Sequence, residues 1–512
     1  MRSSTLSFTS GPTRAPPQVF PLSAAGRTVS TVIVRTFDVV VIGAGPVGEN
    51  VADRAVQGGL TCAIVEAELV GGECSYWACM PTKALLRPGN ALAAARRVPG
   101  AREAVGSIDV PAALAFREAA AAHGDDSGQV EWLEGAGITL VRGHGSLDGE
   151  RRVRVTRADG EVETLEARHA VALTTGSEPV VPPVLRGVEV WGSREAVRAT
   201  AIPPRLAVVG GGVVGCELAT AYAALGSQVT LLVRGDRLLP SHEPVAGELV
   251  ADALRAAGVD VRLSTAVTDA TAGDDGAAHL TLDGAGSAGA VLAVDRVVAA
   301  TGRRPRTRDL GLASVDLAQD EAPQVDDTML VDGTDWLYAV GDVNGRALLT
   351  HQGKYQARAA GDAIAARATG TPLDDGPWGR HVATADHAVV PQVVFTDPEV
   401  AAVGRTAAQA EEAGLPVRVV DLDLGAIAGA TVHAEGYTGA ARFVLDAERD
   451  VVLGATFVGQ DVAEMVHAAT VAVVGEVPLH RLWHVVPSYP TLSEVWLRML
   501  EQVGRESAQV RA

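Results

Sequence analysis

The hydrophobic positions of this chain predict the same opening unit twice. Mostly apolar residues occupy positions 37–42, a glycine-rich turn follows, and a second mostly apolar segment covers 61–65. The same order recurs later, with apolar segments at 206–209 and 228–233 around a second glycine-rich turn. A buried strand that enters a helix through a glycine turn opens a βαβ unit that binds a dinucleotide. The pattern therefore predicts two such units in one chain.

The pattern changes from about residue 391. Residues 441–445 and 451–458 flank a charged turn and predict an antiparallel hairpin. Helical patterns follow near 462–474 and 491–502. The stretch before this region, 375–386, is rich in Asp, Gly and Pro, which is typical of a linker. We therefore predict a separate C-terminal domain of the α+β class.

Composition and charge exclude several classes of protein. The 512 residues suffice for three or four domains, and 47% hydrophobic with 21% charged residues is ordinary for a globular protein. We find no run of about 18 apolar residues, so no membrane span is predicted. The net charge of −19 argues against nucleic acid or an anionic membrane as a partner. We expect neither partner, and a location in the cytoplasm.

The first 36 residues differ from the rest of the chain. They contain no Asp or Glu but four arginines and many Ser, Thr and Pro residues, which resembles an organelle transit peptide. The body is rich in Ala, Gly, Val and Arg and poor in Lys, which favours a GC-rich bacterial gene instead. We predict that 1–36 is a disordered N-terminal extension. Whether it belongs to the mature protein, or reflects a wrongly assigned start codon, stays open.

The first glycine turn carries the signs of a nucleotide site. Gly43, Gly45 and Gly48 directly follow a strand, so the backbone can turn tightly and approach a diphosphate at the N-terminus of a helix. Glu66 ends the next strand, where its carboxylate can accept hydrogen bonds from a ribose diol.

The second glycine turn contains Gly210, Gly212 and Gly215, but the matching position after its second strand holds Val233 in place of an acid. Arg234 follows, and a guanidinium pairs well with a 2′-phosphate. This site is predicted to prefer NADPH, with NADH as the alternative if Arg234 is only a solvated loop residue. Two nucleotide sites favour one tightly held flavin and one exchanging nicotinamide.

Two of the four cysteines, Cys74 and Cys79, form a close pair. Residues five positions apart do not share a face of a regular helix, so the pair can bond only where the segment is distorted, as at a helix entry that carries Pro81. A helix N-terminus and a nearby cation both stabilise a thiolate. A metal site is disfavoured because no second Cys/His pair lies at ligand spacing, whereas two inert thiols remain an alternative. Cys62 and Cys216 are expected to fill core.

The segment 71–83, with its C-x4-C-x-P-S/T-K element, resembles the active-site segment of the flavoprotein disulfide reductases. The resemblance extends over 37–503 and implies FAD, a pyridine nucleotide, a two-fold homodimer and a small-molecule electron acceptor. It implies an α/β fold with two Rossmann-like domains, FAD then NAD(P), and a C-terminal α+β dimerisation domain. The expected parts are 37–185 and 306–385 for FAD, 186–305 for NAD(P), and 386–512 for dimerisation.

The resemblance also assigns roles to single residues. Cys79 is the thiol that faces the flavin, and Cys74 is the thiol that exchanges with the acceptor. Lys83 and Glu217 resemble an ion pair near flavin N5, where hydride arrives; the chain has one other lysine, Lys354. The remaining implied nucleotide contacts are Gly145 near the adenine, Thr175, Gly176, Thr301 and Gly302 at the crossovers, Asp342 at the ribityl chain, and Thr350 at a helix aimed at the pyrimidine.

The sequence departs from the family pattern near its C-terminus. Disulfide-reducing members carry a His-Pro-x-x-x-Glu element whose His, from the other subunit, is the acid-base partner of the thiols. Here Glu494 is present but Tyr489 holds the His position, with His484 as an upstream substitute. A Tyr with a pKa near ~10 is ionised in about one molecule in a thousand at pH 7, so it is a poor base but can donate a proton.

Other departures concern access to the redox centre. A Tyr at position 489 resembles mercuric reductase, but the adjacent C-terminal cysteines of that enzyme are absent. Val213 stands where an aromatic side chain often shields the flavin, which favours access by quinones or oxygen. Tyr76 and Trp77 lie between the cysteines, where they either narrow access to Cys74 or fill core.

Three functions are compatible with these features. The leading prediction is an NAD(P)H oxidoreductase that acts on a sulfur group, in which electrons pass through FAD to Cys74 and Cys79 and then to an external acceptor. The second is direct reduction of a quinone or soft metal ion from the flavin. The third is a flavoprotein component of a larger assembly with little turnover of its own. The natural acceptor is not encoded in any motif.

Overall fold

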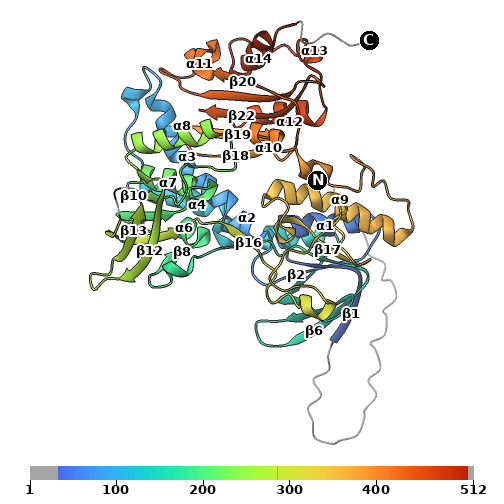
Figure 1. The fold of residues 1–512 in the computed structure, drawn as a ribbon. Coiled ribbons are helices and arrows are strands. Elements are labelled where there is room, and N and C mark those ends of the chain that lie inside the picture. Colours follow the sequence, from blue (N-terminus) through green and yellow to red (C-terminus); the bar gives the residue numbers. More distant parts are fainter. Residues whose placement is uncertain (1–32, 285, 287, 506–512) are drawn as a thin grey trace, which may run out of the picture.

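Figure 1 shows the protein as a computed structural model, which describes residues 33–284, 286 and 288–505. Most of the predicted N-terminal extension lies outside the described residues. The prediction is wrong for the last four residues of this extension, 33–36. They form the beginning of strand β1 (Ile33–Ile42). They pair with positions 163–166 of strand β6 (Val162–Leu173), a contact between distant parts of the chain. Among the described helices, none is long and apolar enough to cross a membrane.

The first unit is built around a mostly parallel sheet. Strand β1 lies between β2 (Cys62–Glu66) and β6, with the order β3-β2-β1-β6-β5-β4. Strand β17 (Leu337–Ala339) returns to this sheet and pairs with β6, so the unit is assembled from two separate stretches of chain. Helices α1 (Pro46–Gln57) and α9 (Thr350–Thr369) pack against each other beside it. Its other elements are β3 (Thr139–Arg142), β4 (His144–Leu147), β5 (Arg152–Thr156), α2 (Gly72–Tyr76), α3 (Cys79–Arg96), α4 (Val110–Ala120) and α5 (Ser127–Gly135).

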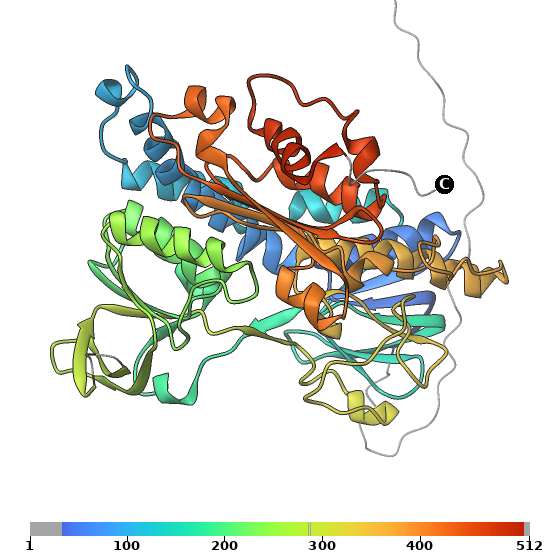
Figure 2. The same cartoon turned by 45° about the horizontal axis from the view of Figure 1, so that its top comes forward.

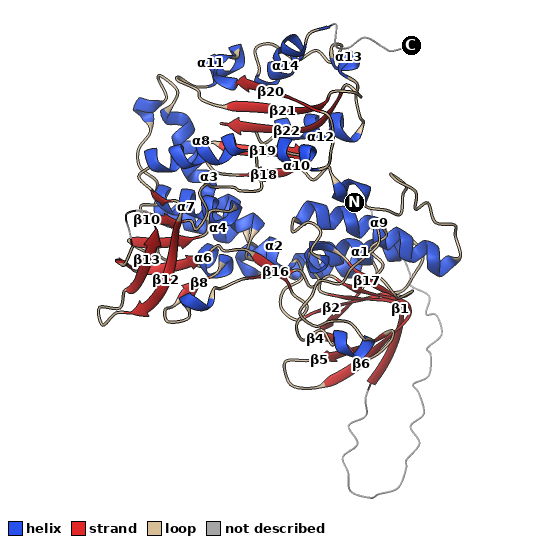
Figure 3. Cartoon of the chain, in the orientation of Figure 1, coloured by secondary structure: helices blue, strands red, loops and turns tan. Residues whose placement is uncertain are grey.

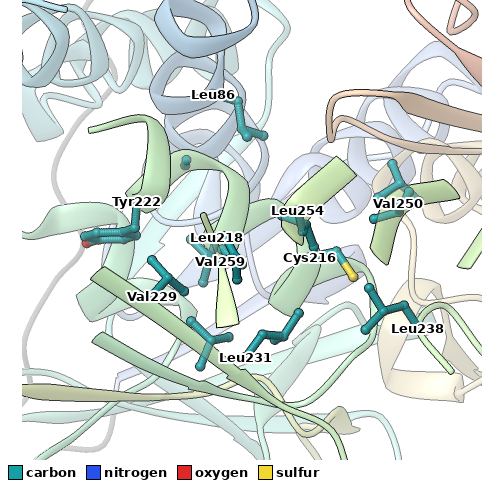
Figure 4. Packing of buried hydrophobic residues seen from close by; sticks show 14 of the residues in the cluster. Leu86, Cys216, Leu218, Tyr222, Val229, Leu231, Leu238, Val250, Leu254 and Val259 are labelled. Carbon is teal, nitrogen blue, oxygen red and sulfur yellow. The ribbon is translucent and has the colours of Figure 1, made fainter. Parts of the chain in front are cut away.

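The second unit repeats the first on a smaller scale. Its parallel sheet has the order β11-β10-β9-β15-β8, and helix α7 (Val213–Ala224) follows β9 as α1 follows β1. Figure 4 shows its core, to which Cys216 and Tyr222 of α7 and Leu86 of α3 all belong. Its elements are β8 (Val190–Trp191), α6 (Ser193–Arg198), β9 (Arg205–Val209), β10 (Gln228–Leu232), α8 (Pro244–Ala256), β11 (Asp260–Arg262), β12 (Thr265–Ala272), β13 (Ala278–Gly284), β14 (Ala290–Val294) and β15 (Arg296–Ala299). The expectation that Cys62 and Cys216 fill core is confirmed, because both are buried.

The two glycine turns share one geometry. Gly43 and Gly210 both have positive φ, at 105° and 121°, which favours glycine. A Cβ on Gly48 would come within 1.9 Å of the Gly43 carbonyl oxygen, and a Cβ on Gly215 would come equally close to that of Gly210. The prediction of two βαβ units is therefore confirmed, and these glycines are required for the helix to pack on the turn.

The C-terminal unit is an antiparallel sheet with the order β18-β19-β22-β21-β20 (Figure 3). The predicted hairpin is present as β21 (Ala440–Asp446) and β22 (Val451–Gly459). The other elements are β18 (Gln392–Val394), β19 (Glu399–Gly404), β20 (Val417–Asp423), α10 (Ala407–Glu412), α11 (Ala428–His433), α12 (Met465–Val474), α13 (Leu479–Leu482) and α14 (Val495–Val503). Figure 2 shows this sheet, in orange, running above the other two units, to which Arg97–Asp397 and Arg442–Glu243 ion pairs connect it.

Candidate active site

A cavity of about 1040 Å³ opens where the three units meet. It brings together most of the residues singled out in the sequence, which are Gly43, Gly45, Glu66, Cys74, Cys79, Lys83, Gly145, Thr175, Gly176, Glu217, Asp342 and Thr350. It is also lined by Val213, on the side of the second glycine turn. Other predicted residues lie outside its lining, namely Gly48, Gly210, Gly212, Gly215, Arg234, Gly302, Tyr489 and Glu494.

The cysteine pair lies at a break between two helices. Cys74 belongs to the short helix α2, which ends at Tyr76, and Cys79 is the first residue of α3. Ala78 between them has non-helical backbone angles, φ −138° and ψ −95°, so the predicted distortion at this helix entry is present. Both cysteines are free thiols and hydrogen-bond to each other. The Cys79 sulfur also lies 3.3 Å from the Thr350 hydroxyl at the N-terminus of α9.

The two thiols have opposite electrostatic surroundings. The hydrogen bond from Cys74 lowers the pKa of Cys79 to about 6; a hydrogen bond from Thr350 and the positive charge of Lys83 act in the same direction, against burial. The same hydrogen bond, burial and the negative charge on Cys79 raise the pKa of Cys74. These surroundings favour the thiolate of Cys79 over that of Cys74.

An ion pair joins the first and second units next to the thiols. The Lys83 ammonium on α3 lies 2.7 Å from the Glu217 carboxylate on α7. Glu217 is buried, and its other oxygen accepts a hydrogen bond from the backbone N–H of Phe395 at 3.0 Å. The Lys83 nitrogen also lies 4.9 Å from the centre of the Phe395 ring. Phe395 was missed in the sequence, where it stands in an ordinary apolar strand pattern.

The first nucleotide site fits FAD. A Cβ on Gly45 would meet no atom within 4 Å, so the space in front of the turn, at the N-terminus of α1, is open for a diphosphate. Glu66 is held against the turn, because its carboxylate accepts a hydrogen bond from the Ala44 N–H at 2.7 Å. On another wall, Asp342 accepts a hydrogen bond from the Ser177 hydroxyl at 2.6 Å. Burial raises the pKa of both carboxyl groups, which suits them to meet the hydroxyls of a ribose and a ribityl chain.

The second nucleotide site is open at the same position. A Cβ on Gly212 would meet no atom within 4 Å, as at Gly45. Val233 is buried beneath the turn, where a Cβ on Gly211 would approach its Cγ1 to 2.8 Å. The place of the usual acid is therefore filled by methyl groups. Arg234 is exposed and forms no ion pair with a described residue.

The predicted C-terminal acid-base residues do not line the cavity of the thiols within one chain. Tyr489 is 76% exposed and lies outside the lining of the cavity. Glu494 is buried; one of its oxygens accepts a hydrogen bond from Arg498, and the other has no partner among the described residues. Val485 and Val486 next to them are exposed as well, and so is His484. Tyr489 thus belongs to an exposed segment of the C-terminal unit that includes Val485 and Val486.

The fold and the site together define a class of protein. Residues 37–363 match the pyridine nucleotide-disulphide oxidoreductases, and residues 390–500 match the dimerisation domain of the same family. The chain therefore belongs to this family, as a class I flavoprotein disulfide reductase, and the predicted fold class is confirmed. The expectations of an FAD-dependent oxidoreductase that acts on a sulfur group, and of FAD and a pyridine nucleotide as cofactors, are confirmed with it.

Individual relatives are similar over nearly their full length. Dihydrolipoyl dehydrogenase of Thermus scotoductus is 32% identical, with 93% of this chain and 99% of the relative covered. Dihydrolipoyl dehydrogenase 3 of Pseudomonas aeruginosa is 33% identical, with 90% and 97% covered. Among solved structures, the Cu(II) complex of the HOCl-induced flavoprotein disulfide reductase RclA from Escherichia coli has a TM-score of 0.76 at 24% identity, and covers 92% of this chain and 100% of its own. LpdA from Mycobacterium tuberculosis has the same TM-score, identity and coverage.

Proposed function

We propose that this protein passes two electrons from NADPH, through FAD, to the Cys74–Cys79 disulfide and then to an external disulfide. The observation that carries the proposal is that Cys79, Thr350 and Lys83 gather on one wall of the cavity that Glu66 and Asp342 also line. Bound FAD supplies the conversion of a hydride into two electrons that a disulfide can accept. The Lys83–Glu217 pair keeps a positive charge next to Cys79 and so favours its thiolate.

The cysteines then complete the transfer by thiol–disulfide exchange. The Cys74 sulfur attacks one sulfur of the acceptor disulfide, which releases one thiol and leaves a mixed disulfide. The Cys79 thiolate attacks the Cys74 sulfur, which releases the second thiol and re-forms the Cys74–Cys79 disulfide. The two released groups each need a proton, one of which comes from Cys74. We propose that Tyr489 of the partner subunit, in a homodimer built on the C-terminal unit, donates the other; its exposure and the family's dimerisation domain support this.

The acceptor class is proposed from the relatives. Several of them are named dihydrolipoyl dehydrogenases, so a small dithiol–disulfide couple is the first candidate, and a cytoplasmic location accords with it. A second candidate function is reduction of a quinone or soft metal ion directly from the flavin. It is favoured by Val213, which leaves the nicotinamide side of the cavity without an aromatic cover, and by the absence of a His at position 489.

Counting electrons tests the proposal. Anaerobic titration of the FAD-loaded enzyme with NADPH should consume about two equivalents per subunit, because the flavin and the disulfide each take two electrons. Both cysteines should become alkylatable after the first equivalent. Uptake of a single equivalent, with both thiols alkylatable from the start, contradicts the redox role of the pair. Initial rates with a panel of disulfides, quinones and Hg(II) then identify the acceptor class.

The preference for NADPH rests on Arg234 and Val233. Replacing Arg234 with alanine removes the guanidinium expected at the 2′-phosphate, so KM for NADPH should rise by about tenfold while KM for NADH stays unchanged. Arg255 on α8 is a matched control, because it is exposed in the same unit and its one ion pair with a described residue is with Asp252. Equal kcat/KM values for NADH and NADPH that are unchanged in Arg234→Ala contradict this preference.

A further inference from the structure

One arginine of the second unit contacts the redox loop of the first unit, residues 73–79, which carries both cysteines. Arg194 is the second residue of α6. Its guanidinium lies over the Trp77 ring, with the guanidinium carbon 3.9 Å from the ring centre. The same group donates hydrogen bonds to Glu73 at 2.8 Å and to both oxygens of Glu68 at 2.9 and 3.1 Å. A planar group that stacks with its face and pairs with its edge can fix two partners at once.

The partners of Arg194 are placed at the redox loop itself. Trp77 lies between Cys74 and Cys79, at the break between α2 and α3, and is buried. Glu73 directly precedes Cys74. The backbone of this break is irregular at Ala78, so its geometry depends in part on where these side chains are anchored.

The other side of the loop is anchored too. The Tyr76 ring packs against Trp77 at 5.7 Å between centroids, and its hydroxyl donates a hydrogen bond to the Val70 carbonyl at 3.0 Å. The two large residues that sequence analysis found between the cysteines therefore fill core and do not simply block access. Tyr76 ties the loop to its own unit, whereas Trp77 is tied across the domain boundary by Arg194.

A series of polar contacts leads from Glu73 toward the flavin site. Glu73 also lies 3.9 Å from Arg303, whose guanidinium donates to the Ser177 hydroxyl at 2.8 Å. Ser177 in turn donates to Asp342 at 2.6 Å. Strands β7 (Ser177–Pro179) and β16 (Arg303–Pro305) form the antiparallel ribbon between the first two units. The contact between Glu73 and Arg303 therefore connects the loop with this ribbon.

We propose that Arg194 is a positioning residue for the Cys74–Cys79 pair, which it holds in register with Thr350 and Lys83 by stacking on Trp77 and pairing with Glu73. The proposal rests on the redox role of the cysteines proposed above. Arg194 touches neither sulfur, so it acts through the loop. Without it, Trp77 loses the charged face above its ring and Glu73 is left with the longer contact to Arg303. The loop can then shift Cys79 away from the groups that stabilise its thiolate.

Alkylation of Cys79 across a pH series separates this role from simple support of the fold. The titratable and charged groups that face Cys79 are Cys74 and Lys83, and Lys83 is paired with Glu217. In the NADPH-reduced holoenzyme, the rate of alkylation at Cys79 should rise with pH to a midpoint near the Cys79 pKa of about 6. In Arg194→Ala this midpoint should move up by about one unit, and kcat with a disulfide acceptor should fall by about tenfold.

Two variants serve as comparisons. Arg304→Ala is the matched control, because Arg304 forms an exposed ion pair with Glu178 on the neighbouring ribbon and touches no residue of the loop; it should change neither the midpoint nor kcat. Arg194→Lys keeps a charge for Glu73 but not the stack on Trp77, so it should restore the midpoint only in part. A lower melting temperature in Arg194→Ala, with the Cys79 midpoint and kcat unchanged, would overturn the positioning role and leave the redox pair intact. If instead the Cys74→Ser variant reduces disulfides at the normal rate, the proposed function itself fails, whatever Arg194→Ala does.

Discussion

Replacing Cys74 with serine should lower kcat with a disulfide acceptor by about a thousandfold or more, because a serine hydroxyl can neither form nor break the bond between the two sulfurs. Cys74 is partly exposed and hydrogen-bonds to Cys79, so the change alters little besides the sulfur atom. Reduction of the flavin by NADPH should continue at nearly the normal rate, since that step precedes the disulfide. Stopped-flow measurements of both steps check the result.

The same variant separates the two enzyme functions. If electrons leave through the cysteines, turnover of disulfides disappears while turnover of quinones from the flavin persists. Ser75→Ala is a suitable control, because Ser75 is the neighbour of Cys74, is similarly exposed and carries no sulfur. Normal disulfide turnover in Cys74→Ser is incompatible with the mechanism proposed here.

Replacing Lys83 with methionine should produce the second large effect, on both stability and rate. Glu217 is buried, and this change leaves it with one hydrogen bond, from the Phe395 N–H. Removing one partner of a buried ion pair typically costs about 3–5 kcal/mol. The Lys83 side chain is 36% exposed, so water already screens this pair and a loss of about 2–3 kcal/mol is expected. Urea unfolding of the FAD-loaded protein measures it.

The rate effect of Lys83→Met has a separate cause. The ammonium is the positive charge nearest Cys79, and its removal should lower the thiolate fraction and slow reduction of the disulfide by about a hundredfold. The double variant Lys83→Met/Glu217→Gln removes the unpaired carboxylate, so it should recover most of the stability but none of the rate. A double variant as unstable as Lys83→Met would show that the charge on Glu217 is not the source of the lost stability.

Much of the site could be predicted because its chemistry is local in sequence. The glycines at 43, 45 and 48 and the acid at 66 belong to one βαβ unit, whose turn requires small residues and whose strand end places the acid. The cysteine pair and Lys83 lie within one short segment, and the break at Ala78 follows from their spacing. The C-terminal hairpin was predicted for the same reason, since its charged turn and alternating strands are neighbours.

Other contacts join residues far apart and could not be predicted. The beginning of β1, at Ile33, is a strand because it pairs with positions 163–166, far away in the sequence. The local sequence of residues 33–36 contains no sign of these partners, so it was assigned to the extension. The Thr350 hydroxyl contacts the Cys79 sulfur as well as lining the flavin side, although sequence analysis assigned Thr350 to the flavin only. The hydrogen bond from Phe395 to Glu217 links residues of two different units.

By itself, the sequence determined the class of fold, the two nucleotide turns and the pair of cysteines proposed to carry electrons, because each depends on backbone geometry or spacing within a short stretch. Only the tertiary structure shows which sulfur has the lowered pKa, what anchors Trp77, and that Tyr489 is exposed and lies outside the lining of the cavity that holds the thiols of its own chain. The physical reason is that a pKa and the position of an irregular loop are set by neighbouring charges and contacts. Those neighbours come from all three units of the fold.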